Sequence, residues 1–190
     1  VDEQNAKFPR PVQERRGDMT LQRIEMTDYP FFVDVRTSGF ERGHPAVAGL
    51  PNATFPWASP LTVTPPDGVT ATVFAHTTDA AWEYSGDTLE PPTPTDTRKA
   101  SPVGVVLTGK FPSAFKGDDK SGKITQESLP DARLAVVGSA DVVSDLILSL
   151  AQSPGGEVHR ANLQLVQNLV DWSTEDTDLL GIRTVGAYAR

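Results

Sequence analysis

The sequence contains no cysteine, which removes several classes of protein at once. Without a thiol the chain has no disulfide, no cysteine nucleophile and no cysteine-ligated zinc or iron–sulfur site. It also lacks an uninterrupted apolar run of about 18 residues, the length that crosses a bilayer as a helix. These absences leave the compartment open, because an oxidising environment permits disulfides without requiring them.

Basic residues are scarce relative to acidic ones. The 190 residues include 17 Lys and Arg against 25 Asp and Glu, which gives a formal net charge of −8. An acidic surface repels the phosphates of nucleic acids and the headgroups of anionic lipids. We therefore expect no nucleic-acid partner and no direct lipid binding.

Proline and glycine are frequent, with 16 and 15 residues respectively, while 38% of the chain is hydrophobic and 22% is charged. This composition supports a buried core built from many short elements and excludes a coiled coil, a collagen-like fibre or a long-helix bundle. Residues 1–28 are polar, and we predict a leader or the remnant of a preceding region there. Residues 29–190 are predicted to form a single α/β domain. The first residue is not Met and no signal-peptide pattern follows it, so we expect a fragment of a longer protein.

Four segments have the β-branched, apolar character of strands. Alternation over 29–35 predicts a strand, and so do the runs at 69–75 and 103–108. The run at 132–138 is almost continuously apolar, as in a sheet that is covered on both faces. The stretch 43–66 is interrupted by six prolines, which limits it to short extended pieces and turns.

Helical periodicity follows the last of these strands. Apolar spacing predicts helices over 142–151 and 162–172, the first capped by Ser139 or Asp141. A strand, a tight turn and two helices form half of an open α/β sheet. The predicted fold class is therefore α/β, with an open, mostly parallel sheet, flanking helices and an incomplete set of strands.

The aromatic residues Trp57, Trp82 and Tyr84 are candidates for a ligand groove that takes a sugar or a peptide. The alternative is that these side chains close the edge of a small core, which is the more frequent use of such residues.

A second candidate is the turn after the strand at 132–138, where Ser139 and Asp141 lie at the position that ligands occupy in open α/β sheets. The turn lacks the glycine series of a pyrophosphate site and the Gly-x-Ser-x-Gly elbow of a serine nucleophile. Helix capping explains the same residues and is the preferred interpretation.

The remaining polar groups do not form a catalytic set. His44, His76 and His159 are far apart, and none has a second histidine at metal-ligand spacing. The acidic group Glu175, Asp176 and Asp178 lacks the glycine and further oxygen donors of a calcium loop, and residues 116–123 are predicted to be a solvated loop. We predict no catalytic residue, no metal site and no cofactor.

Taken together, an ordered set of segments over residues 29–185 resembles the auxiliary component of uncharacterised ABC transport systems, which is related to the gliding-motility auxiliary protein. The segments are YPFFVDVR (29–36), HPAVAGL (44–50), FPWASPL (55–61), GKFPSAF (109–115), LAVVGSAD (134–141), NLQLVQNLVDW (162–172) and DLLGIR (178–183).

The resemblance implies an extracytoplasmic, periplasmic domain of a bacterial inner-membrane protein, anchored by a helix that follows the Ile182-Arg183 region in the parent. It implies a flavodoxin-like or amidotransferase-like fold and work beside an ABC permease and ATPase. The chain itself has no phosphate-binding loop of the Gly-x-x-x-x-Gly-Lys type.

The leading hypothesis is thus a non-enzymatic auxiliary domain, either substrate-binding-like or scaffolding, of a transport or gliding-related system. A sugar- or peptide-binding module with an unidentified small ligand is the second hypothesis. A degenerate amidotransferase-like hydrolase that uses Ser139 is the third.

Overall fold

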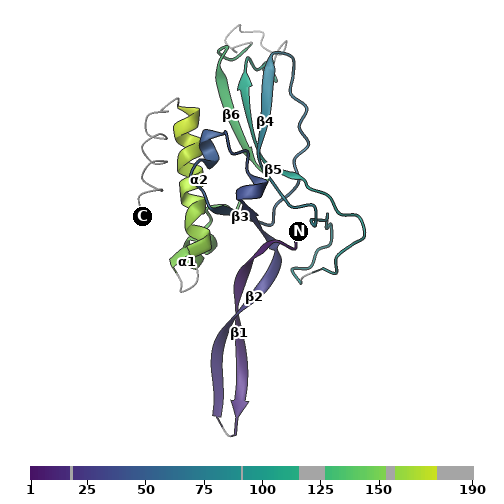
Figure 1. The fold of residues 1–190 in the computed structure, drawn as a ribbon, viewed down its shortest axis with the longest axis vertical. Helices are drawn as coiled ribbons and strands as arrows, with labels where there is room; N and C mark the ends of the chain where they lie inside the picture. Colours follow the sequence, from purple (N-terminus) through teal and green to yellow (C-terminus); the bar gives the residue numbers. More distant parts are fainter. Residues whose placement is uncertain (18, 91, 116–126, 153–156, 175–190) are drawn as a thin grey trace.

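The computed structural model describes residues 1–17, 19–90, 92–115, 127–152 and 157–174. Within these ranges the chain forms two antiparallel three-stranded sheets and two α-helices (Figure 1). The first sheet has the order β1-β2-β3, and the second has the order β4-β5-β6. The elements in chain order are β1 (Asn5–Arg16), β2 (Met19–Arg36), η1 (Thr37–Gly39), η2 (Pro45–Val47), β3 (Asn52–Pro56), β4 (Val69–His76), β5 (Pro102–Gly109), β6 (Ala132–Val137), α1 (Asp145–Gln152) and α2 (Glu157–Ser173).

Strands β1 and β2 form a long hairpin that extends away from the rest of the molecule (Figure 1). Every residue of β2 from Met19 to Asp28 is exposed, whereas Phe31 to Val35 are buried. The burial changes at the hairpin base, where the ring of Phe8 packs against those of Tyr29 and Phe32. One strand pair therefore serves two roles, as part of the core at its base and as a solvent-exposed arm beyond it.

The second sheet is joined to the first through the buried centre of the molecule. A bridge pairs Phe40 with Ala75, and the amide of Glu41 donates to the carbonyl of Phe74. Phe74 is fully buried against Gly104, where a Cβ atom would lie 2.4 Å from the ring. Gly104 is thus required by the close approach of an aromatic ring, and the two sheets share one apolar core.

The helices lie on one side of the molecule, with α2 packed along β3 (Figure 1). The buried face of α2 combines Leu165, Leu169 and Trp172 with two asparagines. Asn162 accepts a hydrogen bond from the amide of Thr54 and donates to the carbonyl oxygens of Thr54 and Val142, at 2.7–2.8 Å. The open edge of β3 is therefore satisfied by a helix side chain instead of another strand.

The predicted α/β class with an open, mostly parallel sheet is wrong, because every strand pair in the described residues is antiparallel. The four predicted strands do exist, within β2, β4, β5 and β6. The error lies in the direction and covering of β6, which pairs antiparallel with β5 at the sheet edge and leaves Leu134 and Val136 exposed. A flavodoxin-like or amidotransferase-like sheet is therefore excluded for this chain.

Residues 1–28, predicted to be a polar leader or remnant, contain β1 and the outer half of β2. The boundary between this segment and a domain over 29–190 stays a prediction. Both predicted helices are present, but α1 begins at Asp145, later than predicted. The segments 116–123 and 175–178 lie outside the described residues.

Candidate functional site: an aromatic cavity

A cavity of about 510 Å³ opens between the base of the hairpin, the end of β3 and the segment 77–101. This volume falls in the range of small-ligand sites, roughly 300–1,000 Å³. Its wall is part aromatic and part polar, and it draws on segments that are far apart in the sequence. The aromatic and charged residues of the wall are Phe31, Trp57, Trp82, Tyr84, Glu83, Asp87 and Lys99.

The three aromatic residues singled out in the sequence, Trp57, Trp82 and Tyr84, line this one cavity. Trp82 is buried, and Tyr84 is half-buried with its ring 5.5 Å from that of Phe31 in an edge-to-face contact. Trp57 also packs against a cluster of buried core residues, so the two interpretations are compatible for this residue. Ligand binding by them stays a prediction.

Trp57 has a backbone conformation that is unusual for its residue type. It follows β3 directly and has φ of 47°, in the left-handed region that glycine normally occupies. Its amide donates to the carbonyl of Phe31 at 2.7 Å, and its indole lies edge-on to Phe32 at 5.1 Å. Strained non-glycine residues of this kind concentrate at binding sites, and the packing here over-determines the position of the ring.

Trp82 is held from two sides. Its amide donates to the carbonyl of Val1 at 3.1 Å, and the guanidinium of Arg98 lies 6.0 Å from its ring centroid. The indole nitrogens of Trp82 and Trp57 are both buried without a hydrogen-bond acceptor among the described residues. A buried donor without a partner costs free energy, so these two indoles are set apart from the satisfied polar groups around them.

The polar part of the wall carries charges of both signs. Lys99 and Glu83 form an ion pair at 2.9 Å, with each side chain more than half exposed. Asp87 lies on the same wall, and the hydroxyl of Tyr84 makes a hydrogen bond with that of Thr88 at 2.9 Å. A wall that combines aromatic and charged side chains suits a small ligand that has both an apolar face and hydrogen-bonding groups.

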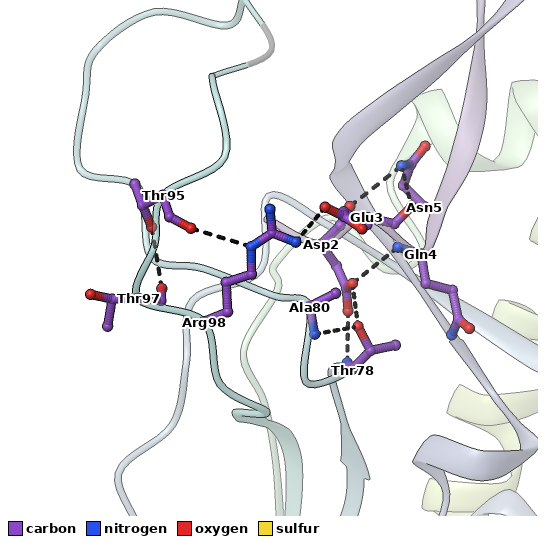
Figure 2. A network of polar contacts seen from close by, with 9 residues as sticks. All are labelled: Asp2, Glu3, Gln4, Asn5, Thr78, Ala80, Thr95, Thr97 and Arg98. Carbon is purple, nitrogen blue, oxygen red and sulfur yellow. Dashed lines mark hydrogen bonds and ion pairs between the residues drawn. The ribbon is translucent and has the colours of Figure 1, made fainter.

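A buried carboxylate ties the base of β1 to the cavity wall (Figure 2). Asp2 is fully buried and accepts hydrogen bonds from the amide and the hydroxyl of Thr78, at 2.7 and 2.6 Å, and from the amide of Gln4 at 3.0 Å. Next to it Glu3 pairs with Arg98, whose Nε donates to the carbonyl of Thr95. This network fixes the segment 77–101 against the hairpin.

Ser139 and Asp141, the other two candidate residues, do not line this cavity. The Ser139 hydroxyl is buried, donates to the carbonyl of Pro56 at 2.5 Å and accepts from the amide of Asp141. Neither residue caps α1, because the amide of Leu148 donates to the carbonyl of Ser144, which makes Ser144 the residue before the helix. The predicted cap is therefore placed wrongly, and Ser139 instead joins β6 to the end of β3.

The histidines lie apart and serve local roles. His44 accepts a hydrogen bond from the amide of Ala46 through Nδ1 at the start of η2, as expected for a turn. Burial lowers the pKa of His44, with a smaller opposing effect of Glu41. Burial likewise lowers the pKa of His159, with a smaller opposing effect of Asp34. No group of metal-ligating side chains converges within the part of the chain that the structure describes.

Sequence reasoning missed two features of the site. Phe31 and Lys99 line the cavity, and Asp2 braces it, yet nothing in the sequence links residues 2, 31 and 99. Strand pairing and the hydrogen bonds of Asp2 to Thr78 bring them together in the folded chain. A helix that is both long and apolar enough to cross a membrane is absent from the described residues.

A family model described as an ABC-type uncharacterized transport system matches residues 1–171 of the chain. No curated protein and no solved structure matches. The family match includes residues 1–28, so the hairpin arm is part of the family's pattern.

Proposed function

Because the chain belongs to the family of auxiliary components of ABC-type uncharacterized transport systems, we propose that it is a non-enzymatic, extracytoplasmic domain that binds a small ligand in its aromatic cavity. The convergence of Trp57, Trp82 and Tyr84 on one cavity of about 510 Å³ carries this proposal. The ligand is a sugar or a short peptide, since both combine apolar faces with hydrogen-bonding groups.

The non-enzymatic part of the proposal is supported by the state of Ser139. A serine nucleophile needs a hydroxyl that is open to substrate and hydrogen-bonded to a base. The Ser139 hydroxyl is buried and gives its proton to the carbonyl of Pro56. This geometry argues against the hydrolase hypothesis. We expect Ser139→Ala to lower the free energy of unfolding and to leave any hydrolase activity of the preparation unchanged.

Tryptophan fluorescence tests ligand binding directly. Two of the three tryptophans line the cavity, while Trp172 lies on α2 in the core. A cavity ligand from a panel of sugars and short peptides should therefore change the emission of a Trp172→Phe variant as much as that of the wild type. A response that vanished in Trp172→Phe, or silence across the whole panel, would contradict cavity binding.

The half-buried Tyr84 supplies the matched variant for affinity. Removing its ring with Tyr84→Ala deletes part of the wall without opening the core, and we expect about tenfold weaker binding. Phe115→Ala, which removes an exposed ring outside the cavity wall, is the control and should leave the affinity unchanged.

The location and partners are tested in cells. Working beside an ABC permease and ATPase on the extracytoplasmic side predicts co-purification of this domain with a multi-span permease. It also predicts that a topology reporter fused to the parent protein places the domain outside the cytoplasm. A cytoplasmic signal from the reporter would refute the location while leaving the ligand assay unaffected.

A further inference from the structure

The outer edge of β2 is unoccupied along the arm. Strand β3 pairs only with Phe32 to Arg36, so no described strand covers that edge over Met19–Asp28. An open strand edge exposes a row of unpaired N–H and C=O groups, and proteins normally shorten, cover or block such edges. Ten consecutive exposed residues on a projecting strand are an unusual departure from this rule.

The two edges of the hairpin differ in their capacity to pair. Pro9 and Pro11 lie on β1 opposite Met26 and Ile24. Proline has no N–H, so the backbone nitrogen of each of these prolines must face away from β2. The two prolines therefore block the outer edge of β1. The alternation of an antiparallel ladder then directs the backbone N–H and C=O groups of Ile24 and Met26 toward the outer edge of β2. That edge has no proline from Met19 to Asp28 and is open to another strand.

The side chains on this edge are apolar on one face. Residues directly opposite share a face of the ribbon, which places Ile24, Met26, Pro9 and Pro11 together. Ile24 is 72% exposed and Met26 is 38% exposed. Clustered apolar side chains in solvent mark an interaction surface, and Ile24 and Met26 lie at the open edge itself.

The charges on the other face specify a self-complementary register. If Ile24 lies opposite Ile24 of a second, antiparallel copy, Arg23 of each chain lies opposite Glu25 of the other. Shifting one copy by two residues along the other, in either direction, places Arg23 opposite Arg23 or Glu25 opposite Glu25. Like charges that lie directly opposite each other are destabilising. Glu25 already lies opposite Arg10 on β1, so the symmetric register gives a row of alternating charges across the strands.

We propose that the outer edge of β2 over Met19–Asp28 pairs antiparallel with the same edge of a second copy of this chain, with Ile24 opposite Ile24, to form a four-stranded sheet. The pairing buries Ile24 and Met26 of both copies and satisfies the open backbone groups. It does not depend on the proposed ligand cavity, which lies at the other end of the hairpin.

Cross-linking through an introduced cysteine tests the register, since the chain has no cysteine of its own. Ile24→Cys places two thiols at the symmetry axis, where paired residues have Cα atoms about 5.5 Å apart, within disulfide range. Mild oxidation should yield a covalent dimer on a non-reducing gel. Gln13→Cys puts a thiol on the exposed, blocked edge of β1, and it should remain monomeric. Equal cross-linking of the two variants would overturn the proposal.

Sedimentation equilibrium of the uncross-linked protein tests the pairing itself. Ile24→Pro removes an outward N–H without touching the β1–β2 ladder and should weaken the dimer about tenfold or more. Gln13→Pro makes the same change on the edge of β1 and should leave the dimer intact. Arg23→Glu should also weaken it, and adding Glu25→Arg together with Arg10→Glu, which keeps opposite charges at the paired positions 10 and 25, should restore it. Wild-type protein that stays monomeric up to its solubility limit overturns the proposal.

Discussion

Asn162 on α2 replaces the neighbouring strand that β3 lacks. Its amide group bonds both backbone groups of Thr54 and also the carbonyl of Val142. A side chain with one acceptor and two donors is the kind that can meet this pattern at once, which explains one of the two asparagines on the buried face of α2. In the sequence the same residue counts only as a polar interruption of a helical stripe.

We expect Asn162→Ala to lower the free energy of unfolding by about 3 kcal/mol, because three buried backbone groups lose their partners. Urea denaturation measures the change. Gln167→Ala, an exposed position on the same helix, is the control and should cost less than about 0.5 kcal/mol. A loss in Asn162→Ala no larger than in the control would contradict the role assigned to this side chain.

His159 predicts a pH dependence of stability. Its side chain is 2% exposed, and burial lowers its pKa below the value of about 6.5 that it has in an unfolded chain. Between the two pKa values the unfolded state binds more protons, so stability falls as the pH falls through this window. Above pH 6.5 or so the contribution is complete, and below it the free energy of unfolding should decline by up to about 1.4 kcal/mol per pH unit.

Urea denaturation between about pH 5.5 and 7.5 measures this slope. His159→Gln should reduce the decline, and His44→Gln should remove a second contribution of the same sign, because its pKa is lowered too and its neutral Nδ1 holds the amide of Ala46. A decline that is unchanged in both variants would assign the pH dependence to other groups.

At the scale of elements, the sequence located strands better than it determined their partners. The runs at 69–75, 103–108 and 132–138 correspond to β4, β5 and β6 because β-branched, apolar composition is a local property. Strand direction is not local. The apolar run of β6 resembles a strand buried on both faces, yet β6 is an edge strand that leaves Leu134 and Val136 exposed.

The hairpin arm was missed for the opposite reason. Burial produces the alternation that identifies a strand, and the outer half of β2 has no buried face. Two local signals were present in residues 1–28. Pro9 and Pro11 are spaced as an edge strand requires, and Gly17 lies at the turn with φ of 65°.

Because the arm extends beyond the core, we expect its removal to leave the fold intact. Replacing residues 9–26 by Asn-Gly closes the hairpin next to Phe8 with a turn that favours tight β-hairpins. The free energy of unfolding should change by less than about 1 kcal/mol, since the deleted part buries little apolar surface. The control is Phe8→Ala, which removes contacts to Tyr29 and Phe32 and should be more destabilising. Collapse of the shortened chain would show that the arm is part of the folding unit.

At the scale of the whole molecule, the aromatic cavity is a product of assembly. Its wall combines the start of the chain, the end of β3 and the segment 77–101, so no single element contains it. Trp57 and Trp82 are 25 positions apart, and the brace at Asp2 is further away still. Aromatic residues could therefore be recognised as candidates from the sequence, whereas the cavity that unites them depends on the strand pairing and on the contacts that hold the segment 77–101 against the hairpin base.

We expect Asp2 to hold the cavity wall in place, although it does not itself line the cavity. Asp2→Ala removes the acceptor for two groups of Thr78 and for the amide of Gln4, which frees the segment 77–101 from the hairpin base. We expect faster amide exchange across residues 77–101, measured by hydrogen–deuterium exchange, and weaker binding of any ligand that the fluorescence screen identifies. Glu3→Ala breaks the exposed ion pair with Arg98 in the same network and should have a much smaller effect, because surface ion pairs contribute about 0–1 kcal/mol. If the two variants exchange alike, the buried carboxylate does not brace the wall, and the cavity owes its shape to the packing of Trp57 and Trp82 alone.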